Sequence, residues 1–231
     1  MIVWLASYPR SGNTFLRILL HRLFGVPTLS VYSMTDGQKR IAEDVGKLMR
    51  LVGQMEEARD INLAHTDSVT HFVKTHNLPD GDDSPAIVLV RDGRDAVVSH
   101  AHFYLKTELG IDDPCKKVFE GALEQIITGD HFGGWSGNVN AWTSRVHPDM
   151  VIRFEDLIDD PLNIVNATVR RLGINVPMRG EPPSFEELHS TVPWFFRKGK
   201  SGGWRQEMPP HLEKLFLERH GGTLRQLGYL E

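Results

Sequence analysis

The chain contains 231 residues, of which 40% are hydrophobic and 24% charged, and its 26 Lys and Arg against 30 Asp and Glu give a net charge of −4. This composition is typical of a folded globular protein and excludes disordered, collagen-like and disulfide-scaffold classes. The mild negative charge disfavours a general nucleic-acid-binding protein, which would be basic. The length predicts one α/β domain that covers residues 1–231.

Two features predict a soluble cytoplasmic protein that does not enter a membrane. The single cysteine, Cys115, cannot form a disulfide within the chain, and this favours a reducing compartment. The apolar run at residues 2–6 is too short for a signal peptide, and the run at 15–24 is interrupted by Arg17, His21 and Arg22. We therefore expect neither an export signal nor a transmembrane segment.

Four short apolar runs rich in β-branched residues predict buried parallel strands. They cover residues 2–6, 71–73, 86–90 and 150–152. Helical spacing of apolar residues follows three of these runs and recurs near the C-terminus. It predicts helices at 15–24, from 92 onward, at 161–172 and at about 209–220. The order of elements indicates an α/β fold with a central parallel sheet and helices on both faces.

One helix start carries a specific capping signal. We expect Asp92 to cap the helix that follows the third strand, with Asp95 three residues later completing a capping box.

Basic side chains stand where three of the predicted strands end. Arg10 follows the first strand, Lys74 and His76 follow the second, and Arg91 follows the third. The carboxyl ends of parallel strands share one edge of a sheet, where open α/β folds bind their ligands. The sequence therefore predicts a site for an anionic ligand at this edge.

Residues 8–14, Tyr-Pro-Arg-Ser-Gly-Asn-Thr, join the first strand to the first helix. Gly12 permits a tight turn, and the amides of the helix N-terminus can bind an anion beside the hydroxyls of Ser11 and Thr14. The segment lacks the glycine and lysine spacing of a Walker A loop, which disfavours a nucleoside-triphosphate kinase.

Two further segments carry groups that bind phosphate. In residues 90–104, Arg91 ends a strand and Ser99 lies about two turns into the next helix, so that a second phosphate fits between them. In residues 195–204, basic side chains alternate with glycines in a loop that can close over a phosphate. His100 and His102 point to different faces of a helix, and we expect no metal there.

Six segments, in order from residue 4 to residue 204, together resemble the cytosolic-type sulfotransferases that use 3′-phosphoadenosine 5′-phosphosulfate (PAPS). YPRSGNTF is similar to their YPKSGTTW loop, FVKTHNLP to KTHLP, and VRDGRDAVVSHAHFY to RNPKDVAVSYYHFY. FGGWSGNVNAW is similar to GSWxxHVxxW, FEDL to YEDM, and FRKGKSGGW to RKGxxGDW. The resemblance implies a P-loop-like sulfotransferase fold.

The resemblance also implies roles for individual residues. His76 is expected to be the general base, with Lys74 and Arg10 at the reacting centre. The 5′-phosphosulfate is expected to contact Arg10, Ser11, Gly12, Asn13, Thr14 and Phe15. The 3′-phosphate is expected to contact Arg91 and Ser99, with Arg197, Lys198 and Gly199 closing over it.

Four positions depart from the family pattern. Arg10 replaces a lysine, Phe15 a tryptophan, Phe154 a tyrosine and Gly203 an aspartate. Phe15 and Phe154 remain cofactor-binding candidates, with purely hydrophobic contacts to the adenine, and the way in which the adenine is held stays open.

The reaction that follows is transfer of a sulfuryl group from PAPS to a hydroxyl of a small-molecule acceptor, with PAP as product and no metal. The alternatives are a P-loop-type small-molecule kinase and a non-catalytic PAP-binding module. The acceptor and the oligomeric state are left open. Residues 27–65, 105–131 and 177–195 are expected to line the acceptor pocket as loops.

Overall fold

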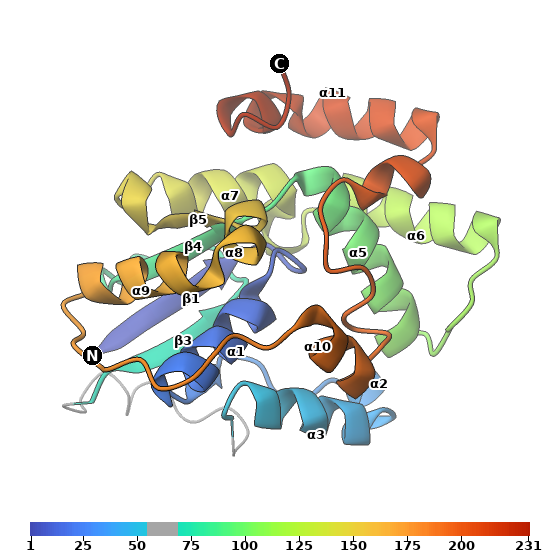
Figure 1. Ribbon diagram of the computed structural model, residues 1–231. Helices are drawn as coiled ribbons and strands as arrows, with labels where there is room; N and C mark the ends of the chain where they lie inside the picture. Colours follow the sequence, from blue (N-terminus) through green and yellow to red (C-terminus); the bar gives the residue numbers. More distant parts are fainter. Residues whose placement is uncertain (55–68) are drawn as a thin grey trace.

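The computed structural model describes residues 1–54 and 69–231. Within them, five parallel strands form one sheet in the order β2-β3-β1-β4-β5. The strands are β1 (Ile2–Ser7), β2 (Thr28–Ser30), β3 (His71–Thr75), β4 (Ala86–Val90) and β5 (Val151–Arg153). The predicted parallel sheet is therefore confirmed, and Figure 1 shows it in the middle of the molecule, between helices.

Ten described helices surround the sheet, together with three short 3₁₀ turns. The first five along the chain are α1 (Asn13–Phe24), α2 (Asp36–Lys39), α3 (Ala42–Leu51), α5 (Gly93–Thr107) and α6 (Lys116–Thr128). The others are α7 (Gly134–Thr143), α8 (Phe154–Asp159), α9 (Pro161–Arg171), α10 (Phe185–Thr191) and α11 (Pro210–Gln226). The 3₁₀ turns are η1 (His131–Gly133), η2 (Pro148–Met150) and η3 (Gly203–Gln206).

Successive side chains of each strand point to opposite sides of the sheet, so each strand contributes to the packing of both faces. Val3 and Leu5 of β1 pack with apolar side chains of α1 and α9. Trp4 and Ala6 pack on the other face, with side chains of α5, α7 and α11. Continuous burial explains why β1 and β4 are apolar at almost every position.

Several sequence-based expectations were wrong in detail. Strand β2 was not predicted, because three residues are too few to show a period. The last helix continues beyond His220 to Gln226. The segments expected as pocket loops contain α2, α3, α6 and α10. Within the first of these segments, residues 55–65 lie outside the described part.

The predicted capping box is also wrong, although its cap is present. The Asp92 carboxylate accepts a hydrogen bond from the backbone N–H of Arg94. Asp95 does not complete the box, since its carboxylate instead accepts hydrogen bonds from the amides of Gly202 and Trp204. Tertiary partners that a local pattern cannot reveal have taken the place of the reciprocal cap.

None of the helices in residues 1–54 and 69–231 has the length and apolar content needed to cross a bilayer.

Candidate active site

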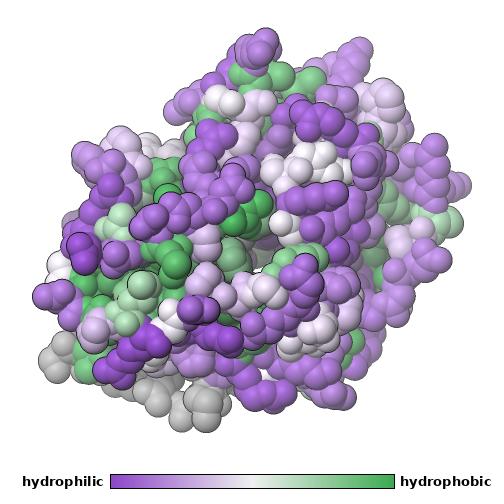
Figure 2. Space-filling model, viewed as in Figure 1, coloured by the Kyte–Doolittle hydropathy of each residue, from purple (hydrophilic) through white to green (hydrophobic). Residues whose placement is uncertain are grey.

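A cavity of about 910 Å³ lies beyond the carboxyl ends of β1, β3 and β4. Arg10, Lys74, His76 and Arg91 all line it, so the basic groups expected at one edge of the sheet do lie in one cavity. Of the other predicted site residues, all line the cavity except Ser11, whose side chain is fully buried. Figure 2 shows this face of the molecule hollowed near its middle, with apolar residues gathered among polar ones.

The turn from β1 into α1 depends on a close approach of its backbone to an aromatic ring. Gly12 has a φ of 98°, and a Cβ atom there would lie 2.5 Å from the Phe154 ring. Glycine is therefore required both by conformation and by space. The first amides of α1 have no partner inside the helix, so those of Asn13, Thr14 and Phe15 are available to an anion.

The Asn13 side chain is bound to β1. Its Nδ2 atom donates to the carbonyl oxygen of Leu5 at 2.8 Å and to Ser7 Oγ at 3.2 Å. The side chain thus ties the loop back to β1, and only the backbone of Asn13 is left for the predicted anion contact.

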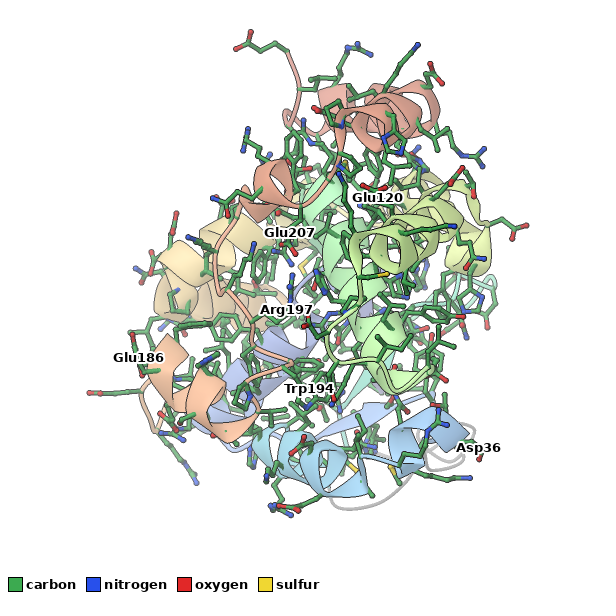
Figure 3. All side chains as sticks on the ribbon, turned by 90° about the vertical axis from the view of Figure 1, so that its right-hand side faces the viewer. Asp36, Glu120, Glu186, Trp194, Arg197 and Glu207 are labelled. Atoms are coloured by element: carbon green, nitrogen blue, oxygen red, sulfur yellow. The ribbon has the colours of Figure 1, made fainter. Side chains whose placement is uncertain are left out.

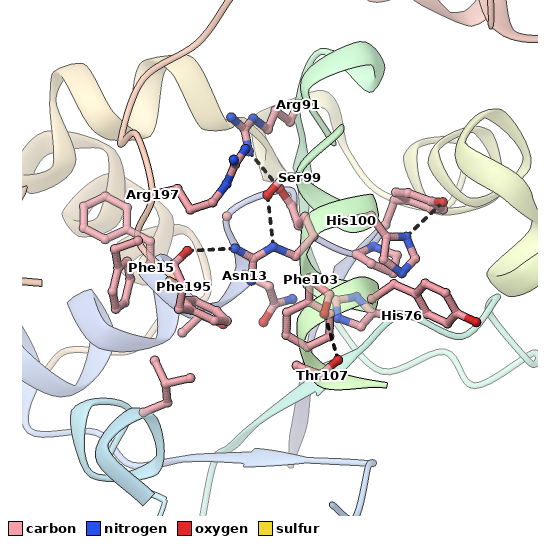
Figure 4. Close-up of a pocket in the computed structure, with 18 of the residues that line it drawn as sticks. Asn13, Phe15, His76, Arg91, Ser99, His100, Phe103, Thr107, Phe195 and Arg197 are labelled. Carbon is pink, nitrogen blue, oxygen red and sulfur yellow. Dashed lines mark hydrogen bonds between the residues drawn. The ribbon is translucent and has the colours of Figure 1, made fainter. Parts of the chain in front are cut away.

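Arg10 lies across the cavity in a fixed orientation. Its Nε donates to Ser99 Oγ at 3.1 Å, one terminal nitrogen donates to the carbonyl of Phe195 at 2.9 Å, and its guanidinium lies 4.1 Å from the Phe195 ring centroid. Figure 4 shows these hydrogen bonds, with Ser99 above and Phe195 beside. Burial, helped by Arg91 and Arg197, lowers the pKa of Arg10 to about 9.

Arg91 stands between the turn and the C-terminal glycine-rich loop. It donates to the carbonyl of Arg10 at 3.1 Å and to that of Lys200 at 3.3 Å, and it lies 4.4 Å from the Phe154 ring centroid. Its Nε atom is buried, and no residue of the described segments accepts its hydrogen. Phe154 therefore supports both Gly12 and Arg91.

Residues 197–204 are held by two carboxylates. Asp95 accepts from the Gly202 amide at 2.6 Å and from the Trp204 amide at 2.9 Å. Glu207 accepts from Arg197 at 3.3 Å and from Lys198 at 2.6 Å, and it also contacts His102 Nε2 at 2.5 Å. Figure 3 shows Arg197 and Glu207 close together. Burial raises the pKa of Glu207, but hydrogen bonds from His102, Lys198 and Arg197 outweigh it and hold the pKa well below its ordinary value.

His76 is held from several directions just after β3. Its Nδ1 lies 2.7 Å from the carbonyl oxygen of Ser7. Its backbone N–H donates to the Tyr32 hydroxyl at 2.7 Å, and its carbonyl accepts from Asn138 Nδ2 at 2.8 Å. The Tyr32 ring stacks on the imidazole with ring centroids 5.7 Å apart. Burial, and then the charge of Lys74, lower the pKa of His76 well below its ordinary value.

Lys74 reaches the same cavity from β3. Its Nζ lies 5.6 Å from the Tyr32 ring centroid. Burial, with the charges of Arg17 and Arg10, lowers the pKa of Lys74 to about 7. Lys74 and His76 thus line the same cavity, and their shared role at a reacting centre stays a prediction.

The chain matches the family model described as "Sulfotransferase domain" over residues 2–228. It belongs to the sulfotransferase family. The family expected from the six motifs is therefore confirmed, and with it a transferase enzyme.

Relatives of this sulfotransferase include plant and mammalian proteins. Flavonol 3-sulfotransferase of Flaveria bidentis is 24% identical over 263 residues, and the match covers 96% of this chain and 82% of the relative. Sulfotransferase 1A1 of Bos taurus is 25% identical over 154 residues, covering 56% of this chain and 51% of the relative.

Solved structures share the fold. A mouse sulfotransferase, SULT7A1, complexed with PAP has a TM-score of 0.63 and 20% identity, covering 95% of this chain and 84% of that one. Retinol dehydratase in complex with androsterone and PAP has a TM-score of 0.61 and 18% identity, covering 96% and 80%. The expected sulfotransferase fold is confirmed.

Sequence reasoning missed several residues that shape the site of this sulfotransferase. Asn138 lies in a segment that carried the resemblance, yet no pattern showed that it binds the backbone of His76. Glu207 and Arg17 gave no local signal, because each has a hydrogen-bond partner on a different element, His102 on α5 and Thr28 on β2. The individual roles assigned to the cavity residues stay predictions.

Proposed function

We propose that this sulfotransferase transfers the sulfuryl group to a hydroxyl of a small molecule with an apolar body, and that His76 is the general base. The observation that carries the proposal is the contact of 2.7 Å between His76 Nδ1 and the Ser7 carbonyl. A carbonyl oxygen only accepts, so Nδ1 bears the hydrogen. The lowered pKa keeps the ring neutral, which leaves a lone pair on Nε2 for the proton of the acceptor hydroxyl.

The cavity fits the donor at the β1 and β4 side. Close approach of an anion is supported by Gly12, which has no side chain of its own, and by the free first amides of α1. The buried Arg91 Nε, which lacks a partner among the described residues, supplies a donor for a second anionic group. We assign these residues, with Arg197 and Lys198, to the two phosphate groups of PAP.

Arg10 and Lys74 supply positive charge beside the base. PAPS, when bound, supplies an electrophilic sulfur and a phosphate leaving group. Fixed cations stabilise negative charge that grows during such a transfer, and they do so most strongly where water is excluded. Arg10 is already held by Ser99 and Phe195, so that it needs little reorganisation.

The acceptor side of the cavity is aromatic. Tyr32 and Phe132 flank His76 at ring centroid distances of 5.7 Å each, and Phe103 and Trp194 also line the cavity. Flat apolar molecules are therefore the class that this side accommodates best. The names of the relatives, which mention flavonols, androsterone and retinol, agree with a small molecule of this kind.

The test is the His76→Ala variant with labelled PAPS and a library of phenols and alcohols, read by mass. We expect turnover to fall about 10²–10⁴-fold, the usual contribution of a general base, with PAP affinity unchanged. His147→Ala, a substitution of an exposed histidine outside the cavity, is the control. Turnover close to wild type in His76→Ala would contradict the role of the base. Transfer from ATP with Mg²⁺ in place of PAPS would contradict the reaction itself.

A further inference from the structure

Arg17 is a buried cation of the cavity that the proposed mechanism does not use. It lies one turn after Asn13 on α1, with 5% of its surface exposed, and it lines the cavity. Its Nε donates to Thr28 Oγ1 at 2.7 Å, and a terminal nitrogen donates to Gln54 Oε1 at 2.6 Å. Both acceptors are neutral, and within residues 1–54 and 69–231 no carboxylate forms an ion pair with Arg17.

This arrangement leaves the guanidinium under-satisfied. A buried charge is ordinarily paired, because its transfer out of water is costly. Burial lowers the pKa of Arg17 to about 9, which leaves it charged at neutral pH. Arginine has five N–H donors on three nitrogen atoms, and the described residues accept hydrogen bonds from only two of these nitrogens. The remaining donors and the charge are available to a ligand in the cavity.

The order of the strands separates Arg17 from the donor side. Arg91 follows β4, Arg10 follows β1, Lys74 lies on β3, and Arg17 binds Thr28 on β2. The pKa of Lys74 responds to both Arg17 and Arg10, whereas that of Arg10 responds to Arg91 and Arg197. Lys74 and His76 therefore stand between a donor group of cations and Arg17.

We propose that Arg17 binds a carboxylate, or a similar compact anion, carried by the acceptor at the β2 side of His76. The inference rests on the proposed function and deepens it: the acceptor has a hydroxyl, an apolar body and an anionic group. The acidic side chains that also line the cavity do not oppose this. Asp95 and Glu207 are engaged with the loop at residues 197–204, and Glu108 accepts from Thr35 and Thr107.

The alternative is that Arg17 only ties α1 to β2 and to Gln54. If Arg17 has only a structural role, its removal should lower the stability of the protein and change the affinities for neutral and anionic ligands equally. An anion-binding role predicts a difference between an acid and its uncharged isostere. The ratio of the affinities for the acid and the amide in one protein therefore separates the alternatives, because this ratio does not depend on the amount of folded enzyme.

The experiment uses three pairs of phenols with spacers of increasing length: 4-hydroxybenzoate, 4-hydroxyphenylacetate and 3-(4-hydroxyphenyl)propanoate, each with its amide. Calorimetry on the PAP-loaded protein gives the affinity for each probe, and turnover with PAPS gives the rate. We expect wild type to bind at least one acid about tenfold or more tightly than its amide, the size of one charge-assisted hydrogen bond. Arg17→Gln should reduce that ratio to about one, and Arg17→Lys should retain part of it.

The control is Arg50→Gln, which removes an exposed arginine outside the cavity and should leave the ratio unchanged. A wild-type protein that binds no acid more tightly than its amide overturns the inference, whether or not the variants fold. A preference that persists in Arg17→Gln overturns it as well. Failure of PAP binding and of all sulfuryl transfer would instead overturn the proposed function.

Discussion

Lys74 is a cation whose protonation depends on what occupies the cavity. Burial beside Arg17 and Arg10 lowers its pKa from an ordinary value near 10.5 to about 7. A bound anion replaces part of the lost hydration and offsets the neighbouring positive charges, so it raises this pKa again. We therefore expect binding of PAP above pH 7 to be coupled to uptake of a proton by Lys74.

The sign of the pH dependence follows directly. Below pH 7, Lys74 is protonated in both the free and the bound protein, and its proton does not affect affinity. Above pH 7 only the bound protein keeps the proton, so PAP affinity should fall as pH rises, by up to about tenfold per unit. Calorimetry between pH 7 and 8.5, in buffers of different ionisation enthalpy, measures both the affinity and the proton uptake. Lys74→Met should remove both effects, and a pH-independent affinity in wild type would refute the assignment.

His76 shows how a reactive residue can depend on an element remote in sequence. Asn138 and Trp142 of α7 bind the backbone carbonyls of His76 and Asn77 at 2.8 and 2.9 Å. Together with the Ser7 carbonyl on β1, these bonds fix the imidazole between two elements. The motif at residues 132–142 thus supports the base by positioning its backbone.

At the scale of elements, the loop at residues 197–204 is attached to the start of α5 by one carboxylate. Asp95 accepts from Ser201 Oγ at 3.2 Å as well as from the amides of Gly202 and Trp204. An ionised carboxylate accepts all three, whereas an asparagine presents one oxygen and an NH₂ group that repels the amides. The order of the loop, and with it the position of Arg197 and Lys198, depends on this charge.

We expect Asp95→Asn to weaken PAP binding about tenfold or more, because each hydrogen bond to a charged group contributes roughly 1.5–3 kcal/mol. The melting temperature should also fall, since the freed amides are partly buried. Asp36→Asn removes an exposed carboxylate on α2 and serves as the matched control. PAP titration and thermal unfolding of both variants measure the two effects. An Asp95→Asn protein with the affinity of wild type would show that the loop is ordered by other contacts.

At the scale of the whole molecule, the cavity joins segments from nearly the full length of the chain. Its walls come from residues near 10, 74, 91 and 197, and its cations repel one another when no anion is present. A ligand that neutralises these charges therefore stabilises the whole fold, because the segments it bridges cannot separate while it is bound.

We expect PAP to raise the melting temperature by about 5–10 °C at a concentration of about 100 Kd. A ligand at that concentration contributes about 2.7 kcal/mol, and each kcal/mol corresponds to roughly 2–4 °C at this chain length. AMP at the same concentration should raise the melting temperature far less, because it lacks the 3′-phosphate assigned to Arg91 and Arg197. Scanning fluorimetry with the two nucleotides gives the comparison. Equal shifts for PAP and AMP would contradict the assignment of a 3′-phosphate site.

The amino-acid sequence by itself determined four of the parallel strands, the family and a set of candidate residues that line one cavity. Runs such as residues 86–90 are apolar throughout because both faces of the strand are buried, and this signal is local. The site residues near 10, 74 and 91 could be predicted together because parallel strands bring their carboxyl ends to one edge. Local sequence patterns were therefore enough to predict those residues that the strand topology brings close together in space.

Only the tertiary structure decided which partners each polar side chain has, and which side chains remain free to bind a ligand. It turned Asn13 toward β1, gave Asp95 to the loop at residues 197–204 instead of to a capping box, and paired Arg197 with Glu207. It also placed Arg17 in the cavity beside neutral partners. These outcomes depend on hydrogen-bond partners in other segments of the fold, and their energies arise from burial, which no local pattern of residues records.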